Sequence, residues 1–300
     1  MPCYHPLTAW KLFDGSISFK ERGDIVQTLT LPCGQCIGCR LERSRQWAVR
    51  CSHEAQLHES NCFITLTYDP ASVPAGGTLV YSHFQLFMKR YRKMFPLTKI
   101  RFYMSGEYGE DLLRPHYHAC IFGHTFSDRV VHKKSDQGFF IYTSNQLSQL
   151  WPYGFSTVAD FTFETAAYTA RYITSKVNGS MAPDHYNSID LITGELFLRV
   201  PEFNKMSLKP GIGALWYEKF HTDVYPHDRV VIRGSVSKPP KYYDRLLERS
   251  NPLLLEEIQF KRFQEFAPLS ADNSPERLAV KETVKLASIR SLKRNTFKKD

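Results

Sequence analysis

The order of the apolar segments between residues 61 and 177 constrains the fold of this chain more than any other feature of its sequence. Asn61 to Tyr68 is rich in β-branched and aromatic residues and stops at Asp69-Pro70, which predicts a strand. By the same criteria, strands are predicted at residues 99–106, 116–123 and 154–161, and helices at residues 82–95, with Ser82 as N-cap, 145–151 and 163–177. The order is strand, helix, strand, strand, helix, strand, helix.

This order predicts an α+β fold in which helices pack on a mostly antiparallel sheet. The strands at residues 99–106 and 116–123 are separated only by a loop, so they are expected to form a hairpin. The split strand–helix–strand arrangement favours a ferredoxin-like core with flanking helices.

The rest of the chain divides around that core. Residues 1–60 are expected to form a cysteine-containing N-terminal segment, turn-rich to residue 39, and a helix at 41–58. Residues 61–180 are the predicted core. Residues 181–300 are a C-terminal extension with a strand at 230–236, a helix at 242–266 and a basic tail.

The chain carries a net charge of +9, which favours a polyanionic partner without choosing between DNA, RNA and an anionic membrane. Between residues 89 and 101 there are six cations and no acid, with aromatic residues interleaved, as expected of a surface that binds nucleic acid. A solvated helix face would give a similar pattern. The candidate DNA-binding cations are Lys89, Arg90, Arg92, Lys93 and Arg101.

No apolar run approaches the ~18 residues that a membrane span requires, and the N-terminus lacks the features of a signal peptide. We therefore expect a soluble intracellular protein with no membrane partner. The odd number of cysteines, seven, also argues against a secreted disulfide scaffold.

A metal site is suggested by His116 and His118, because side chains at i and i+2 of a strand point to the same face. Two imidazoles leave a metal under-coordinated, and a carboxylate would complete the site. Glu107, at the other end of the hairpin loop, is the first candidate, and Glu110, within the loop, is the second. A His-x-His pair also arises by chance, so this pair alone is weak evidence.

A second group lies on the helix predicted at residues 163–177. Tyr168 and Tyr172 are one turn apart on one face, and Lys176 continues the same stripe. A tyrosine becomes an effective nucleophile when a metal polarises its target or an ammonium helps it to ionise. An aromatic stripe facing a core would have the same spacing.

The segments CFITLTYDP, SGEYG with RPHYHACIFG, and AAYTARYITSK resemble the three ordered motifs of the HUH endonuclease superfamily. Within it, the chain is similar to the replication initiators of gokushovirus-type microviruses, phages with circular single-stranded DNA. The resemblance extends to PCGQCIGCRLERSRQWAVRC and LKPGIGALWYEKFHTDVYPHDRVVIRG, so it covers most of the chain.

The resemblance implies specific roles. Thr65 and Thr67 lie in the strand that helps to bind DNA. His116 and His118 hold Mg²⁺ or Mn²⁺, with Glu107 as a third ligand. Tyr117 stands between them where the family usually has a bulky hydrophobic residue. Tyr168 and Tyr172 are the catalytic tyrosines, and Lys176 is the lysine that accompanies them.

The implied activity is metal-dependent nicking of a single-stranded origin through a 5′-phosphotyrosine link, which starts rolling-circle replication. The free 3′-hydroxyl primes a host polymerase, with a host helicase as a further partner, in the bacterial cytoplasm. A relaxase or transposase of the same superfamily is the alternative enzyme. A DNA-binding module without nicking activity is the alternative of another class.

A third group, Cys33, Cys36 and Cys39, is closely spaced, which in an intracellular protein indicates zinc more than disulfides. Three thiolates need a fourth ligand, for which Cys3 is the best candidate, with His5 and Cys51 behind it. Reduced cysteines in a tight glycine-containing turn are the alternative. The remaining Cys62 and Cys120 are expected to be buried small apolar residues.

Overall fold

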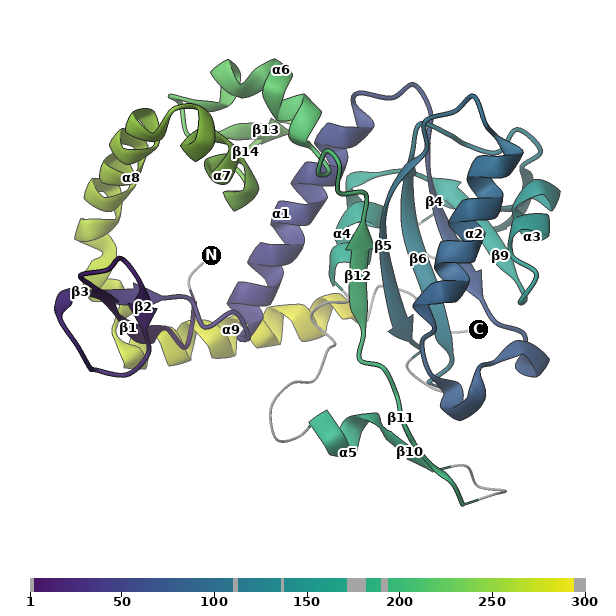
Figure 1. The fold of residues 1–300 in the computed structure, drawn as a ribbon, viewed down its shortest axis with the longest axis horizontal. Coiled ribbons are helices and arrows are strands. Elements are labelled where there is room, and N and C mark those ends of the chain that lie inside the picture. The colour runs from purple at the N-terminus through teal and green to yellow at the C-terminus, as the bar shows by residue number, and fades with distance from the viewer. Residues whose placement is uncertain (1–2, 110–112, 136–137, 172–181, 190–193, 294–300) are drawn as a thin grey trace. The chain divides into compact units, whose positions relative to one another are not determined.

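A computed structural model describes residues 3–109, 113–135, 138–171, 182–189 and 194–293 (Figure 1). By its internal contacts the chain forms two compact units. The central unit is Ser44–Leu255, and the terminal unit combines Met1–Arg43 with Glu256–Asp300. These units cut across the three segments expected from the sequence, because residues from both ends of the chain fold together.

The central unit contains an antiparallel sheet whose strand order is β12-β5-β6-β4-β9-β8-β7 in the described residues. Its middle strands are the predicted ones: β5 (Arg101–Tyr108), β6 (Pro115–Phe122), β4 (Asn61–Thr67) and β9 (Ser156–Asp160). β6 lies between β4 and β5, which are joined through a helix, so the split strand–helix–strand arrangement is present. The predicted α+β class, with a ferredoxin-like core and an antiparallel sheet, is confirmed.

Three strands at the sheet edges were not expected: β7 (Val130–Lys134), β8 (Phe140–Thr143) and β12 (Phe203–Met206). Every residue of β7 is exposed, so its sequence VVHKK has no apolar face that alternation could reveal. These strands extend the predicted core on both sides.

Helices cover both faces of this sheet. The first face carries α2 (Tyr81–Met94) and α3 (Asn145–Leu150), and Figure 1 shows α2 in front of β6 and β4. α2 buries Phe84, Phe87, Met88 and Tyr91, a spacing that keeps one apolar stripe on the sheet. Val80, not Ser82, is its N-cap, because the helix begins one residue before the predicted cap.

The opposite face carries α1 (Ile37–Ala55) and α4 (Phe163–Arg171). These helices use small residues, Ala48 and Cys51 of α1 and Ala166 and Ala170 of α4, which allow close approach to the sheet. Cys62 and Cys120 are fully buried, one on each face of the sheet, as expected.

The remaining elements of the central unit are short. They are η1 (Pro70–Ser72), η2 (Ala75–Gly77), α5 (Ala182–Tyr186), β10 (Asn187–Ile189), β11 (Leu196–Leu198), α6 (Ala214–Val224), β13 (Val230–Ile232), β14 (Ser235–Ser237) and α7 (Lys241–Ser250). The strand expected at 230–236 is therefore the hairpin β13–β14. The helix expected at 242–266 is divided before Pro252 into α7 and α8 (Pro252–Phe266), because proline cannot continue a helix without losing a backbone hydrogen bond.

The terminal unit contains a small antiparallel sheet, β2-β1-β3, formed by β1 (Leu7–Leu12), β2 (Ile17–Ser18) and β3 (Ile25–Leu31). From the other end of the chain come η5 (Ala267–Asn273) and α9 (Pro275–Lys293). Tyr4, Cys36 and Leu278 form its buried cluster. Among the described residues, no helix has the length and apolar composition that a bilayer crossing requires.

Candidate metal centre and catalytic tyrosine

The hairpin β5–β6 brings together the side chains that the sequence singled out for a metal. Its register places Glu107 directly opposite His116, and His118 follows two residues later on the same face. Glu107 Oε1 lies 2.7 Å from His116 Nε2 and 2.6 Å from His118 Nε2. Three ligand atoms that converge in this way can hold one divalent cation.

The protonation of the two imidazoles differs. Burial lowers the pKa of His118 below its ordinary value, which favours the neutral form that binds metal. For His116, burial acts in the same direction, but the charge and hydrogen bond of Glu107 outweigh it and raise the pKa. Glu107 Oε2 is buried without a hydrogen-bond partner in the described part of the chain. A buried carboxylate oxygen in that state fits a site for a cation.

Neighbouring groups fix the orientation of both imidazoles. Thr65 Oγ1 lies 2.9 Å from His118 Nδ1, so the hydroxyl holds the ring nitrogen that faces away from Glu107. His116 Nδ1 donates to the carbonyl oxygen of Arg114 at 3.1 Å, which leaves Nε2 for a ligand role. Thr65, expected to contact DNA, thus also positions a candidate ligand.

Tyr168 of α4 lies beside this cluster. Its ring centroid is 5.1 Å from that of His118, and the two planes meet edge to face. A second edge contact joins Tyr168 to Phe63, at 6.2 Å between centroids. Tyr172, Lys176 and Glu110 lie outside the described residues.

The position of α4 is secured at its start and along its length. Thr162 and Thr165 cap the helix reciprocally, each side-chain oxygen accepting the other's backbone N–H, at 2.9 and 3.1 Å. Ser44 Oγ donates to the carbonyl oxygen of Ala167 at 3.1 Å. The backbone that carries Tyr168 is therefore capped at its start and hydrogen-bonded to α1.

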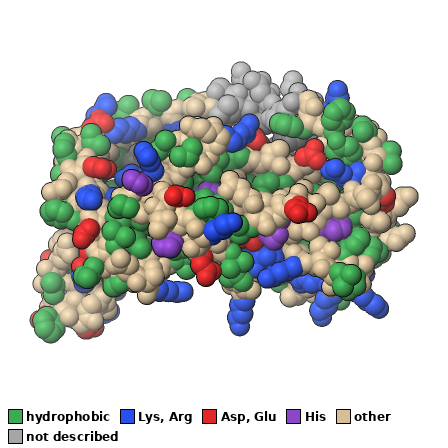
Figure 2. Space-filling view, turned by 90° about the horizontal axis from the view of Figure 1, so that it is seen from above, with side chains coloured by type: hydrophobic (Ala, Val, Ile, Leu, Met, Phe, Trp, Pro, Cys, Tyr) green, Lys and Arg blue, Asp and Glu red, His purple; other side chains and the backbone are tan. Residues whose placement is uncertain are grey.

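The cations expected to bind DNA have a different location. Lys89, Arg90, Arg92 and Lys93 belong to α2, which covers the face of the sheet opposite to His116 and His118. In Figure 2, Lys and Arg side chains project along the lower right edge, the side on which α2 lies in Figure 1. α2 therefore cannot line the candidate metal site directly.

The prediction that Arg101 contacts DNA is wrong. Its side chain is buried, with Nε 2.5 Å from Glu54 Oε1 and a second nitrogen 2.7 Å from the carbonyl oxygen of Pro210. Glu54 also accepts the backbone N–H of Gly213 at 2.7 Å. Arg101 thus neutralises a buried carboxylate inside the protein and presents no charge to DNA.

The four cysteines of the terminal unit also converge. The sulfur atoms of Cys3, Cys33, Cys36 and Cys39 all lie within 4.8 Å of one another. Of the three candidates for the fourth position, the structure brings Cys3 to the cluster, while His5 Nε2 lies 2.7 Å from Glu282 and Cys51 is buried in the core of the central unit. The described residues therefore contain two separate groups that can hold a metal.

Backbone amides point at these sulfurs. Cys3 Sγ accepts the N–H of Cys33 at 3.2 Å, Cys33 Sγ accepts the N–H of Cys36 at 3.3 Å, and Cys36 Sγ accepts that of Tyr4 at 3.4 Å. Burial acts to raise the pKa of Cys36, but hydrogen bonds from amides and neighbouring thiols lower it to about 7. Amides aimed at sulfur stabilise thiolates, the form that binds metal.

The chain is similar to several known proteins. A family model described as replication-associated protein ORF2/G2P matches residues 61–177, a range that includes Glu107, His116, His118 and Tyr168. Replication-associated protein ORF2 of Spiroplasma virus 4 is 32% identical over 288 residues, covering 87% of this chain and 86% of that protein. The chain belongs to this family of replication-associated proteins of small single-stranded DNA phages.

Two further relatives are similar over most of the chain. Replication-associated protein VP4 of Bdellovibrio phage phiMH2K is 31% identical, covering 84% of this chain and 79% of that protein. Replication-associated protein ORF4 of Chlamydia phage 1 is 27% identical, covering 77% of this chain and 56% of that protein. No solved structure gives a significant match.

Proposed function

We propose that this replication-associated protein initiates rolling-circle replication by nicking and rejoining single-stranded DNA at the phage origin. The observation that carries the proposal is the position of Tyr168, whose ring packs on His118 within the cluster of Glu107, His116 and His118. A nucleophile beside three convergent ligands is the arrangement that phosphodiester transfer to tyrosine requires.

The protein's own groups supply most of the chemistry. Mg²⁺ or Mn²⁺, held by Glu107, His116 and His118, would polarise the scissile phosphate when bound. The phenol oxygen of Tyr168 attacks phosphorus in line and loses its proton. The bond from phosphorus to the 3′-oxygen breaks, and that oxygen takes up a proton as it leaves. The products are a 5′-phosphotyrosine and a free 3′-hydroxyl, so no oxidant or nucleotide cofactor is needed.

A second transfer completes the cycle. Tyr172, four residues after Tyr168 in the sequence, cleaves the regenerated origin after one genome length has been displaced. The freed 3′ end then attacks the first linkage and closes the circle. Lys176 assists ionisation of a phenol. The primed 3′ end is extended by a host polymerase with a host helicase, in the bacterial cytoplasm.

We also propose that Cys3, Cys33, Cys36 and Cys39 hold a structural Zn²⁺. Tetrahedral coordination by four thiolates is the ordinary arrangement of structural zinc, and the convergence of the four sulfur atoms supports it. Elemental analysis of protein made with zinc available should find about one zinc per chain. Protein without zinc would reject this site.

Tyrosine-to-phenylalanine variants test the nicking proposal. The change keeps the ring and its packing on His118 but removes the attacking oxygen, so it affects chemistry more than stability. With a single-stranded origin oligonucleotide and Mn²⁺, each single variant should retain some nicking and lose circle closure. The double variant Tyr168→Phe, Tyr172→Phe should form no covalent adduct and still bind the DNA.

Alanine variants test the proposed metal ligands separately. His116→Ala and His118→Ala should abolish Mn²⁺-dependent cleavage, and Glu107→Ala should weaken Mn²⁺ binding more than Glu110→Ala does. Unchanged Mn²⁺ affinity in both histidine variants, measured by calorimetry, would reject the metal assignment. An adduct mapped to Tyr103 or Tyr117 would reject the tyrosines. Wild-type protein that binds origin DNA but never forms an adduct would indicate the non-catalytic DNA-binding module.

A further inference from the structure

A row of residues crosses the sheet from the metal ligands to an exposed aromatic ring. Glu107 pairs with His116 across β5 and β6, and His116 pairs with Thr67 across β6 and β4. The backbone N–H of Thr67 then donates to the carbonyl oxygen of Phe155 at 2.9 Å, next to the register pair Leu66 and Ser156. Residues paired across an antiparallel sheet share a face, so Phe155 lies on the face of the metal ligands.

Alternation along β9 leads to the same placement. Ser156 and Val158 pair with Leu66 and Ile64, which are buried on the α2 face. Phe155 precedes Ser156 and therefore points to the other face. It is 49% exposed, whereas Phe63, Phe84 and Phe122 of the same unit are buried. An exposed ring at this position is a feature that packing does not explain.

The edge strand adds a second ring. The register of β7 and β8 shifts between Val131 and Lys133, so His132 is the extra residue of a bulge. Its ring lies 5.4 Å from that of Phe155, at an angle of 56°. Lys133, the next residue, is exposed and pairs with Ile141. Two rings thus lie together at this part of the sheet, and the residue that follows His132 on β7 is a cation.

We infer that Phe155 is a base-stacking residue for single-stranded DNA, and that the strand runs from the metal centre across Thr67 to Phe155. This inference rests on the proposed function and names a contact to its substrate. Two strand spacings separate His116 from Phe155, roughly 10 Å between backbones, a distance that a short piece of single strand can span. The stacked base therefore lies close to the scissile phosphate.

The chemistry of the surface favours single-stranded DNA as the occupant. Every base has a π-face, and only an unpaired strand can offer that face to an exposed ring. The hydroxyl of Thr67, in the row, and that of Thr157, in the neighbouring row, can accept or donate to phosphates or base edges, and Lys133 of β7 supplies positive charge. The cations of α2 lie on the other face and cannot serve this segment of the strand.

Variants of Phe155 test the inference in the full-length chain with Tyr168→Phe and Tyr172→Phe, so that no turnover occurs. Phe155→Ala and Phe155→Leu should each weaken binding of a fluorescein-labelled oligo-dT roughly 5- to 100-fold, because stacking on one aromatic ring is lost. Phe155→Trp should bind as tightly as the parent or more tightly. Mn²⁺ affinity should not change in any of them.

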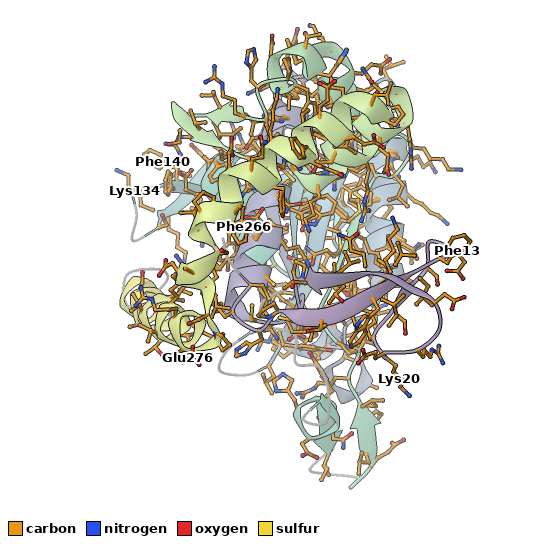
Figure 3. The ribbon with its side chains drawn as sticks, turned by 90° about the vertical axis from the view of Figure 1, so that its left-hand side faces the viewer. Phe13, Lys20, Lys134, Phe140, Phe266 and Glu276 are labelled. Atoms are coloured by element: carbon orange, nitrogen blue, oxygen red, sulfur yellow. The ribbon has the colours of Figure 1, made fainter. Side chains whose placement is uncertain are left out.

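Phe140 offers a matched control. It is 42% exposed and lies on β8, but it shares a face with Tyr142, which pairs with Val158 on the α2 face. Figure 3 shows Phe140 and Lys134 together at the edge of the molecule, and the Lys134 ammonium lies 4.6 Å from the ring centre. Phe140→Ala should leave oligo-dT affinity within about twofold of the parent.

The outcomes separate this inference from the proposed function. Cross-linking of the same oligonucleotide carrying 5-iodouracil should map to Phe155 or His132. Unchanged affinity in Phe155→Ala, wild-type affinity in Phe155→Leu, or cross-links confined to α2 would each overturn the stacking role. None of these results depends on nicking. Absence of a covalent adduct in wild-type protein would reject the nicking proposal while leaving the binding measurement valid.

Discussion

The central and terminal units differ in the extent of the apolar clusters that they bury. The central unit buries a continuous apolar cluster on one face of its sheet, with fully buried rings such as Phe84, Phe87 and Tyr91. In the terminal unit, the cluster that joins the N-terminal segment to α9 consists of Tyr4, Cys36 and Leu278, surrounded by further cysteines. Where apolar burial is small, cross-linking by a metal is an alternative source of stability.

Exposed apolar side chains show the same difference. In the terminal unit Phe13 is 85% exposed, and Figure 3 shows it at the periphery of the molecule. Phe19 and Phe263 are also largely exposed. The unit therefore contains aromatic residues that its own packing does not use. If the proposed zinc is bound, the cysteine cluster is expected to contribute more to the folding of the terminal unit than its small apolar cluster does.

The largest expected effect follows from removing the proposed zinc. Cys36→Ser, or chelation of zinc from the wild type, should release β1–β3 and α9 together, because both are attached to the one cluster. Limited proteolysis and hydrogen exchange should show full loss of protection in the terminal unit and little change in the central sheet. Cys120→Ala, in the core of the central unit, is the control and should keep its zinc. If the terminal unit were equally protected from proteolysis and hydrogen exchange with and without zinc, its stability would not depend on the metal.

A smaller effect is expected from truncating the apolar core. Phe84→Ala deletes a fully buried ring that packs against Phe87, Phe102 and Tyr117, and should cost about 3–5 kcal/mol of unfolding free energy. Phe13→Ala, at an exposed position of the terminal unit, should change it by less than about 0.5 kcal/mol. Denaturant unfolding measures both. Comparable losses would mean that the terminal unit depends on apolar burial after all.

The smallest effect concerns acid. Burial lowers the pKa of His53 to about 3, where the ring stacks on Trp216 and its Nδ1 lies 2.8 Å from the Tyr243 hydroxyl. The folded chain keeps this ring neutral while the unfolded chain protonates it below pH ~6.5, so stability falls as pH decreases. Between pH 7 and 5 this group should remove about 2 kcal/mol from the central unit. Over the same pH range, the free energy of unfolding of His53→Gln should fall by about 2 kcal/mol less than that of the wild type. The same dependence on pH in both proteins would contradict the low pKa of His53.

Much of the central unit could be predicted because its strands and helices have regular apolar periods. His116 and His118 share a strand face by alternation, and Glu107 is brought opposite His116 by the short hairpin. The strand β7 could not be predicted, since all of its residues are exposed. Phe155 was missed for a similar reason: its place on the metal face depends on pairing with Thr67, which is distant in the sequence.

Runs of basic residues in the sequence were a poor predictor of which side chains can reach DNA near the candidate site. Arg101 belongs to a basic run, but its partner Glu54 is 47 residues away, and no local pattern reveals that the pair is buried. The cations of α2 have the spacing of a DNA-binding segment, yet the sheet separates them from the metal ligands. Composition predicts that a chain carries positive charge, while topology decides which face presents it.

The meeting of the two chain ends in the terminal unit has a consequence for synthesis of the protein. His5 and Glu282, which are 277 residues apart, are in contact there, and Leu278 packs on the cysteine cluster. During translation the segment that contains His5 leaves the ribosome long before its partner helix α9, which contains Glu282. The central sheet, which lies between them in the sequence, can therefore close first, whereas the terminal unit is completed only after α9 has emerged.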